Sequence, residues 1–277
     1  MSLSTALERT LAWPQISAPP SWGAIDFISD LHLHASEPET FLAWQHYMEH
    51  TGAQAVFILG DLFEVWVGDD AVGPVADSPS DGDSFEDRCA QTLKRCAAQR
   101  DVFFMRGNRD FLAGEAFTRA CGVQLLEDPT ILDFAGQRWL LSHGDALCLA
   151  DTDYLQFRAL VRSAAWQREF LGQPLEQRKA VARELRERSE ARKRSSPVWV
   201  DVDTREAAAW LTTGGATCLI HGHTHRRADH ALGGNLRRIV LSDWDLRADP
   251  PRAQVLRIAI GTHNGPATVQ RLAPASA

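Results

Sequence analysis

Five short apolar runs, each ended abruptly by polar residues, constrain the fold of this chain more than any other feature. The runs are rich in β-formers and too short for helices; they cover Ala24–Ile28, Val56–Leu59, Val102–Met105, Trp139–Leu141 and Cys218–Ile220. Continuous apolar runs of this kind are typical of strands that are buried on both faces of a sheet. Helical patterns over Glu39–His50 and Asp87–Gln99 lie between several of them. The order predicts a layered α/β or α+β domain with helices flanking the sheet.

The remaining segments predict the domain organisation. Residues 1–21 end in Ala18-Pro19-Pro20-Ser21 and are predicted to be an N-terminal extension. Residues 22–150 and 201–277 are predicted to form the core, with an acidic surface loop at 73–86. Residues 151–200 lack strand signals and carry two helical patterns that are split near Gly172-Gln173-Pro174. With 11 basic and 7 acidic side chains, this range is predicted to be an inserted helical cap.

Composition excludes several classes of protein. The chain has 277 residues and a net charge of −7, which argues against wholesale nucleic-acid binding. Its five cysteines are odd in number and contain no C-x-x-C pair, so they predict neither a disulfide framework nor a zinc ribbon. The N-terminal segment lacks the apolar run of a signal peptide, and no stretch is long enough to span a membrane. We therefore expect a cytoplasmic protein.

Metal-binding side chains follow directly after the five apolar runs. The set comprises Asp30, His32, Asp61, Asn108, His143, His223 and His225. Because the carboxyl ends of strands build the sites of open α/β sheets, we expect these side chains to converge. All are oxygen or imidazole donors, which suit a divalent ion such as Mn²⁺ or Fe²⁺, and seven donors fit two ions that share a carboxylate. A lone Asp-x-His is more often a turn or a cap, but three histidines within five residues rarely serve packing.

The order of these motifs resembles that of the calcineurin-like metallophosphoesterase superfamily. Five segments narrow the resemblance to its UDP-2,3-diacylglucosamine diphosphatase family: 29–33 (SDLHL), 60–70 (GDLFEVWVGDD), 107–112 (GNRDFL), 143–148 (HGDALC) and 221–226 (HGHTHR). The resemblance covers roughly residues 25–260. It implies a four-layer β-sandwich flanked by helices, with residues 151–200 as the cap over the site. The segment Leu241–Asp245 departs from the pattern in some members and contains none of the ligand positions.

The resemblance also implies the site residues, which follow position by position. It assigns one metal to Asp30, His32, Asp61 and His225, and the other to Asp61, Asn108, His143 and His223. Both ions are expected to be Mn²⁺, with Asp61 as the bridge. It implies substrate contacts at Asn108, Arg109, Asp151, Ser189 and His223, of which Asn108, Arg109 and His223 are also catalytic. Further cap contacts between Arg192 and Ser196 stay unassigned.

The activity that the resemblance implies is hydrolysis of a glycolipid nucleotide in lipid A biosynthesis. Attack of an activated hydroxide on the α-phosphorus of UDP-2,3-diacylglucosamine would release UMP and 2,3-diacylglucosamine 1-phosphate. Such a substrate resides in a bilayer, so we expect peripheral association with the cytoplasmic face of the inner membrane. The oligomeric state is left open by the sequence.

Arg109 bears on the substrate class. Many metallophosphoesterases have histidine after Gly-Asn, and that histidine can protonate a departing alkoxide; this chain has arginine, which cannot act as an acid. A phosphate leaving group has a second pKa near 6 and departs without a proton. A fixed positive charge therefore favours cleavage of a diphosphate. The alternative is that Arg109 merely pairs with Asp110.

Two features of the cap have alternative interpretations. An apolar set at mostly helical spacing either packs the cap onto its own domain or lines an acyl-chain groove; it comprises Tyr154, Leu155, Phe157, Leu160, Val161, Trp166, Phe170 and Leu171. The basic run Arg178–Arg194 either forms a solvated helix face or contacts diphosphate and anionic headgroups.

Two competing functions remain. A metallophosphoesterase acting on a soluble nucleotide or phosphodiester shares the metal site and differs in the cap. A non-catalytic scaffold of the same fold would show degraded ligands, whereas all seven ligand positions are filled here.

Overall fold

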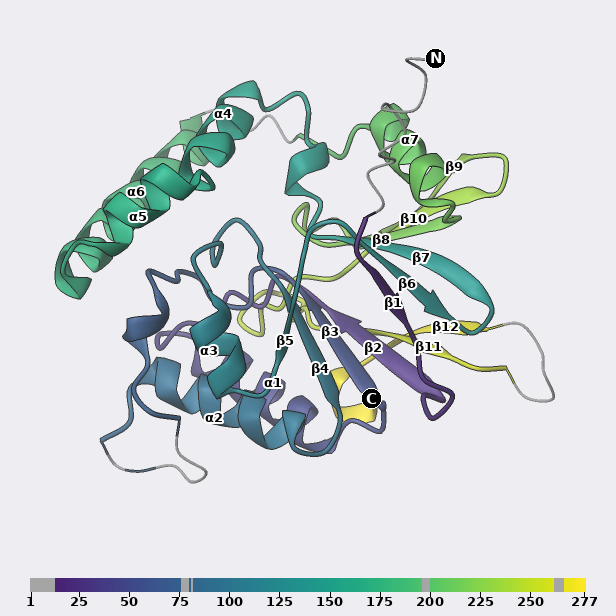
Figure 1. The fold of residues 1–277 in the computed structure, drawn as a ribbon, viewed down its shortest axis with the longest axis horizontal. Coiled ribbons are helices and arrows are strands. Elements are labelled where there is room, and N and C mark those ends of the chain that lie inside the picture. The colour runs from purple at the N-terminus through teal and green to yellow at the C-terminus, as the bar shows by residue number, and fades with distance from the viewer. Residues whose placement is uncertain (1–12, 76–79, 81, 196–199, 262–266) are drawn as a thin grey trace, which may run out of the picture.

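The computed structural model describes residues 13–75, 80, 82–195, 200–261 and 267–277, without the side chains of 186–195. Its core is built on two six-stranded mixed sheets (Figure 1). The first has the order β12–β11–β2–β3–β4–β5, in which β2 to β5 run parallel and the first two strands antiparallel. Its strands are β12 (Thr268–Leu272), β11 (Val255–Ala259), β2 (Ala24–Ile28), β3 (Ala55–Leu59), β4 (Asp101–Met105) and β5 (Gln124–Leu126).

The second sheet has the order β1–β6–β7–β8–β10–β9. Its strands are β1 (Gln15–Ser17), β6 (Thr130–Phe134), β7 (Gln137–Ser142), β8 (Cys218–His221), β10 (Leu236–Val240) and β9 (Ala228–Gly233). The central strands β7, β8 and β10 are parallel neighbours, so their carboxyl ends lie at one edge. That edge and the carboxyl ends of β2, β3 and β4 carry the predicted ligands.

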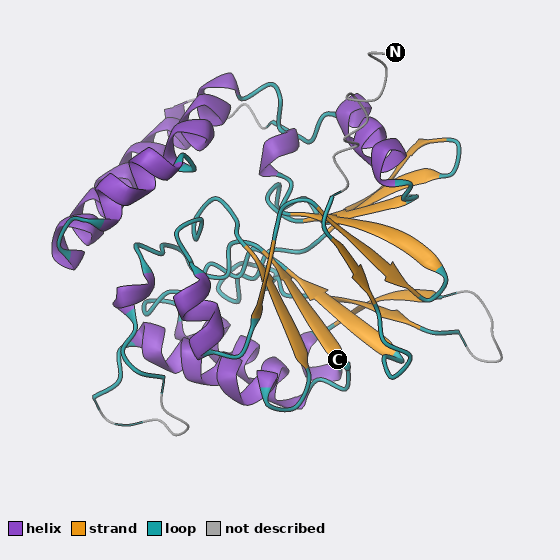
Figure 2. Ribbon diagram, viewed as in Figure 1, coloured by secondary structure: helices purple, strands orange, loops and turns teal. Residues whose placement is uncertain are grey.

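Helices cover the outer faces of the two sheets (Figure 2). The α-helices are α1 (Pro38–His50), α2 (Phe85–Ala97), α3 (Glu115–Ala120), α4 (Thr152–Val161), α5 (Ala164–Leu171), α6 (Leu175–Ser195) and α7 (Thr204–Gly214). Short 3₁₀ turns lie at η1 (Asp69–Ala71), η2 (Asp145–Leu147) and η4 (Pro274–Ser276). None of the helices in the described ranges is long and apolar enough to cross a membrane.

Three apolar clusters separate the layers. One lies between the two sheets and contains stacked Phe57 and Phe103 from neighbouring parallel strands, with ring centroids 4.6 Å apart. Another lies under α1 and α2, around the fully buried Trp44. The third packs α7 onto the second sheet through Leu211. The arrangement of helix, sheet, sheet and helix is the four-layer sandwich that the family resemblance implies. All five cysteines are free and buried.

The cap consists of α4, α5 and α6, which lie together beyond the ligand-bearing strand ends (Figure 1). The sequence predicts two helical segments with a break near Gly172, and the structure adds a second break at Ser163. There the Ser163 hydroxyl accepts a hydrogen bond from the amide of Trp166 and caps a new helix. The cap therefore has three helices rather than two helical segments.

The predicted N-terminal extension differs from the structure in its second half. Strand β1 falls within residues 1–21, yet it pairs in parallel with β6, with Ile16 opposite Leu132. The second sheet thus begins before residue 22; residues 1–12 lie outside the described residues. The three residues of β1 alternate between exposed and half-buried. They form no continuous apolar run from which this strand could have been predicted.

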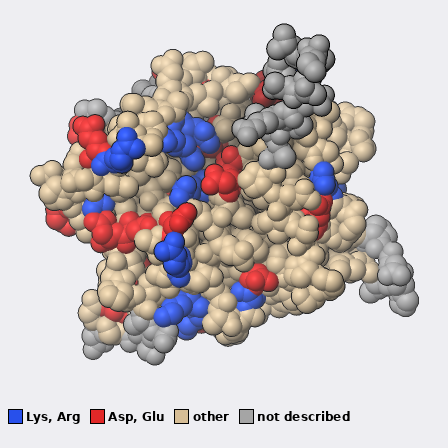
Figure 3. All heavy atoms as spheres, in the orientation of Figure 1, with Lys and Arg blue, Asp and Glu red and all other residues tan. Residues whose placement is uncertain are grey.

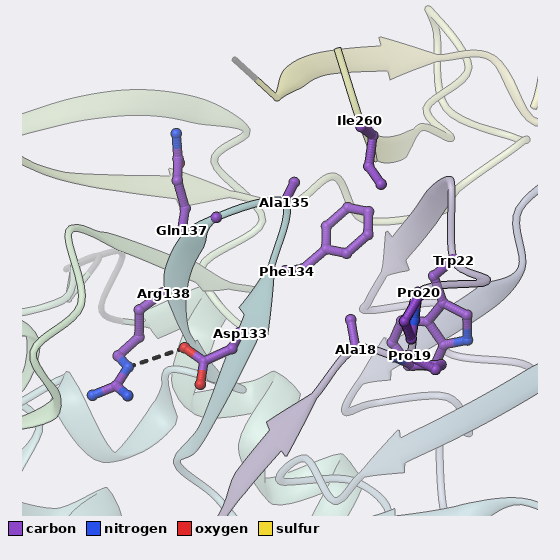
Figure 4. Close-up of a pocket in the computed structure, with 11 residues that line it drawn as sticks. Ala18, Pro19, Pro20, Trp22, Asp133, Phe134, Ala135, Gln137, Arg138 and Ile260 are labelled. Atoms are coloured by element: carbon purple, nitrogen blue, oxygen red, sulfur yellow. Dashed lines mark hydrogen bonds and ion pairs between the residues drawn. The ribbon is translucent and has the colours of Figure 1, made fainter. Parts of the chain in front are cut away.

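A hollow of about 450 Å³ lies beside the segment after β1 and the β6–β7 hairpin (Figure 4). Among the described residues that line it, the titratable ones are Asp133 and Arg138, which pair with each other at 3.1 Å. None of the seven predicted ligands lines it. The hollow is therefore separate from the predicted ligands.

Candidate metal centre and active site

Loops after five strands bring the predicted ligands together. Asp30 and His32 follow β2, Asp61 follows β3, Asn108 follows β4, His143 follows β7, and His223 and His225 follow β8. Five of these residues have backbone φ angles in the left-handed region: Asp30 at 54°, His32 at 48°, Asp61 at 52°, His223 at 66° and His225 at 54°. Non-glycine residues rarely adopt this conformation, and such strain clusters at functional sites.

Glycines permit the close approach of these loops. A Cβ at Gly107 would collide with a carboxylate oxygen of Asp61, and one at Gly222 would collide with the hydroxyl of Ser29. The loops after β3 and β4, and those after β2 and β8, can therefore touch only with glycine at these positions.

One set of donors, which we call the first position, consists of Asp30, His32, Asp61 and His225. The Nε2 of His225 lies 3.3 Å from Oδ1 of Asp30 and 3.2 Å from Nε2 of His32. The same nitrogen of His32 lies 3.8 Å from Oδ2 of Asp61. The donors of Asp30, His32 and His225 all lie within 4.8 Å of one another.

The other set, which we call the second position, consists of Asp61, Asn108, His143 and His223. The Oδ1 of Asn108 lies 3.0 Å from Nε2 of His143 and 2.8 Å from Nδ1 of His223. The Nε2 of His143 lies 3.7 Å from Oδ1 of Asp61. Asp61 therefore presents one carboxylate oxygen to each position, which is the geometry required of a bridge.

These donors fit two divalent ions. Each position has four convergent oxygen or nitrogen donors, and Asp30, Asp61 and His143 are buried. Carboxylates buried so close together are costly unless a cation compensates them. The donor set contains no thiolate, which favours a moderately hard ion.

Charge coupling within the cluster shifts several pKa values. Burial alone would raise the pKa of Asp30, but the neighbouring histidines, above all His225, hold it well below its usual range. For His143, burial alone would lower the pKa, yet Asp61 and Asp145 raise it to about 9. Burial lowers the pKa of His223 to about 4, and the charge of His143 adds to the effect. The carboxylates of the cluster therefore interact with its imidazoles as opposite charges.

Arg109 lies at the edge of the cluster. Its backbone amide donates to Oδ1 of Asp61 at 2.8 Å, and its guanidinium lies 3.6 Å from Glu64. Asp110 instead accepts the backbone amides of Gly107 and Leu62, each at 2.7 Å. The alternative that Arg109 pairs with Asp110 is therefore not what the structure shows.

Several residues outside the predicted set support the ligands. Glu64 lies 2.8 Å from Nδ1 of His32, and Asp243 lies 3.8 Å from Nδ1 of His225. The Leu241–Asp245 segment contains no ligand, but its Asp243 lies beside the ligand His225. Glu64 lies in the motif after β3. No sequence spacing, however, predicts that Glu64 faces His32 or that Asp243 faces His225.

A buried aspartate joins the cap to the site. Asp145 is 0% exposed and accepts hydrogen bonds from the hydroxyl of Tyr154 and from Nε of Arg158, the latter at 2.8 Å. Arg162 lies 3.6 Å from the same carboxylate and donates to the carbonyl of Gly107 at 2.9 Å. The ring of Tyr154 also stacks on His223, with centroids 5.9 Å apart. The start of the cap is therefore tied directly to the ligand loops.

The two predicted substrate contacts of the cap differ in what the structure shows. Asp151 caps α4 by accepting the amide of Tyr154 at 3.1 Å. Ser189 lies on α6, but its side chain is among those that the structure does not describe. The side chains of the unassigned range 192–196 also lie outside the described part of the structure.

Some residues of the cap's apolar set pack against the core, and others are exposed, as a groove for acyl chains would require. Val161 and Phe170 are buried, and Trp166 packs against Phe111 of the core with ring centroids 6.0 Å apart. Phe157 and Leu160, in contrast, are 39% and 56% exposed. One part of the set packs the cap onto the core, and another part stays available at the surface.

The basic run of the cap begins with a structural residue. Arg178 is only 2% exposed; it donates to the carbonyl of Val67 and pairs with Asp70 of the core. On the face seen in Figure 3, basic and acidic side chains alternate between the cap and the core rather than forming one basic surface.

The chain is similar to several known proteins. The family model described as calcineurin-like phosphoesterase matches residues 23–227. The UDP-2,3-diacylglucosamine hydrolase of Chromohalobacter salexigens is 40% identical, over 78% of this chain and 87% of the relative. The protein of that name from Chromobacterium violaceum is 43% identical, over 80% and 90%. A predicted phosphoesterase from Streptococcus pneumoniae has a solved structure with 12% identity and a TM-score of 0.43, covering 93% of each chain.

Proposed function

This chain belongs to the calcineurin-like phosphoesterase family, and on that premise we propose that it hydrolyses the diphosphate of UDP-2,3-diacylglucosamine. The products are UMP and 2,3-diacylglucosamine 1-phosphate, in the pathway of lipid A biosynthesis. The observation that carries the proposal is the pair of four-donor positions that share Asp61, with Arg109 beside them. Relatives with this substrate in their names match most of the chain.

Two divalent ions, which we propose to be Mn²⁺, would occupy the two positions. Asp30, His32, Asp61 and His225 would hold one ion, and Asp61, Asn108, His143 and His223 the other. When bound, such a pair of ions activates water for in-line attack on phosphorus and neutralises charge on the phosphate oxygens.

The chain's own residues orient the substrate for this attack. Arg109 and Asn108 follow the same strand, and His223 contacts the amide oxygen of Asn108. We assign these three residues to the α-phosphate, whose equatorial oxygens gain charge in the transition state. Arg109 supplies a permanent positive charge, and the phosphate that leaves needs no proton.

The cap would bind the lipid part of the substrate. Several of its large apolar side chains, and one at the junction before it, are partly exposed to solvent: Leu149, Phe157, Leu160, Leu171 and Leu185. Burial of acyl chains against such groups would yield about 25 cal/mol for each Å² removed from water. The family resemblance makes Asp151 and Ser189 substrate contacts, and we propose that they bind the polar headgroup.

The same surface leads us to propose peripheral association with the cytoplasmic face of the inner membrane. Exposed apolar side chains next to basic residues are the features by which a cap could rest on anionic lipid. Flotation with vesicles that contain phosphatidylglycerol tests this point. Protein that floats with anionic vesicles and stays behind with neutral ones supports the proposal, and protein that never floats contradicts it.

The decisive experiment for the substrate is hydrolysis of UDP-2,3-diacylglucosamine by the purified protein, with and without Mn²⁺. We expect Mn²⁺-dependent release of UMP, lost in Asp61→Asn and retained in a control at the exposed Arg119, Arg119→Gln. Turnover of bis-p-nitrophenyl phosphate without release of UMP would contradict the lipid assignment and favour a soluble phosphodiester. No turnover and no bound metal would favour a scaffold.

A further inference from the structure

Two carboxylates outside the ligand set lie behind the histidines of the first position. Each ligand histidine there points its Nε2 towards the donor cluster and its Nδ1 away from it. Oε2 of Glu64 lies 2.8 Å from Nδ1 of His32, and Oδ2 of Asp243 lies 3.8 Å from Nδ1 of His225. Glu64 is thus within hydrogen-bond distance of its histidine, whereas Asp243 faces its histidine at ion-pair distance. A carboxylate at Nδ1 favours the tautomer with its proton there, which leaves the lone pair on Nε2 for a metal.

Both carboxylates are held in place from a second direction. Arg252 donates to both carboxylate oxygens of Asp243, at 3.0 and 3.1 Å, and the next amide, of Trp244, donates to the carbonyl of Asp30 at 3.0 Å. The other oxygen of Glu64 lies 3.6 Å from Arg109. The guanidinium partners restrict the rotation of both side chains.

The second position is supported differently. The Nδ1 of His143 faces the backbone carbonyl of Leu59 at 2.9 Å, a neutral acceptor. Asp145, a carboxylate whose charge acts on His143, is directed instead to Arg158 at 2.8 Å and Arg162 at 3.6 Å. This position also takes the neutral amide of Asn108 where the first position has the carboxylate of Asp30.

We propose that Glu64 and Asp243 are positioning residues that orient His32 and His225, so that the first position binds its ion more tightly than the second. The protein then takes up its two ions in order, the first position before the second. This inference rests on the two-ion assignment of the proposed function. Loss of such a partner typically weakens metal affinity 10–100-fold, because the histidine loses both its orientation and part of its basicity.

Titration of metal-free protein with Mn²⁺ alone tests the order of binding, with free Mn²⁺ followed by electron paramagnetic resonance. We expect a tight and a weak equivalent. His143→Ala should retain the tight one and His32→Ala only the weak one, which assigns each equivalent to a position. Equal affinity of the two equivalents in the wild-type protein would overturn the proposal.

Variants of the positioning residues test the cause. We expect Glu64→Gln and Asp243→Asn each to weaken the tight equivalent about 10–100-fold and to leave the weak one unchanged. Asp245→Asn is the matched control, because Asp245 contacts the same Arg252 at 3.0 Å. General damage to the fold would weaken both equivalents, so a tight equivalent that is unchanged, or weakened no more than the weak one, overturns the proposal. If two ions bind with equal affinity, this proposal fails but the proposed hydrolysis stands. If no Mn²⁺ binds, the proposed hydrolysis loses its basis as well.

Discussion

Removal of the charge on Asp145 should loosen the cap while leaving the core folded. The buried carboxylate accepts hydrogen bonds from Tyr154 and Arg158, both on α4. Asp145→Asn preserves the shape and one acceptor oxygen but removes the negative charge. The change therefore isolates the electrostatic part of the link between the cap and the ligand loops.

The magnitude follows from these two contacts. A hydrogen bond to a charged group contributes about 1.5–3 kcal/mol, against about 0.5–1.5 kcal/mol for a neutral pair. Loss of the charge at both contacts therefore costs on the order of 2 kcal/mol, since the Arg158 side chain is 21% exposed and partly screened. Local opening of α4 should then become about 30-fold more frequent, at 1.4 kcal/mol for each factor of ten.

Hydrogen exchange measured by mass spectrometry resolves this effect by peptide. Peptides that cover Thr152–Val161 should exchange about 30-fold faster in Asp145→Asn, while those that cover Ala55–Leu59 should be unchanged. Asp133→Asn, which breaks the solvent-exposed pair with Arg138, is the control and should shift stability by no more than about 1 kcal/mol. Unchanged exchange in α4, or equal acceleration in both regions, would refute the reasoning.

Three further predictions concern catalysis and pH. Arg109→Gln should lower kcat about 10²–10³-fold with a smaller effect on KM, because the guanidinium acts on charge that develops in the transition state; steady-state kinetics with near wild-type kcat would contradict this. Asp30→Ala and His223→Ala should abolish hydrolysis while circular dichroism shows a retained fold, and near-normal turnover in either would contradict the ligand assignment. Burial lowers the pKa of His221 to about 4, and Arg238 contributes. In the unfolded state His221 has a pKa of about 6.5, so below that pH the unfolded state binds a proton that the folded state does not. The free energy of unfolding therefore falls as the pH falls from 6.5 towards 4, by up to about 1.4 kcal/mol per pH unit. Urea unfolding in EDTA should show a weaker pH dependence between pH 7 and 5 for His221→Gln, and equal dependence would refute the assignment.

Much of the fold was predictable because its central strands are buried on both faces. Ala24–Ile28 is a strand with the predicted bounds, and the Val56 and Val102 runs gain only one residue each. Strand β1 was not predictable from an apolar run, since it is three residues long at a sheet edge. Strand β6 carries Asp133 in its interior, which interrupts the apolar pattern.

The candidate site was predictable to the extent that its residues follow strands. The carboxyl ends of parallel strands meet at one edge, so the positions of Asp61 after β3 and Asn108 after β4, which are neighbours in the first sheet, already place these two residues close together. The roles of Glu64, Asp145 and Asp243 depend instead on contacts between segments that are distant in sequence. Only the folded chain shows which of its many surface and buried carboxylates face a histidine or an arginine.

Hydrolysis of UDP-2,3-diacylglucosamine in H₂¹⁸O, in the presence of Mn²⁺, tests the central claim most directly. Attack on the α-phosphorus places the solvent oxygen on the phosphate of UMP. We predict ¹⁸O in UMP and none in 2,3-diacylglucosamine 1-phosphate. The label in the sugar phosphate would contradict the assignment of Asn108, Arg109 and His223 to the α-phosphate, and no hydrolysis would contradict the proposed substrate.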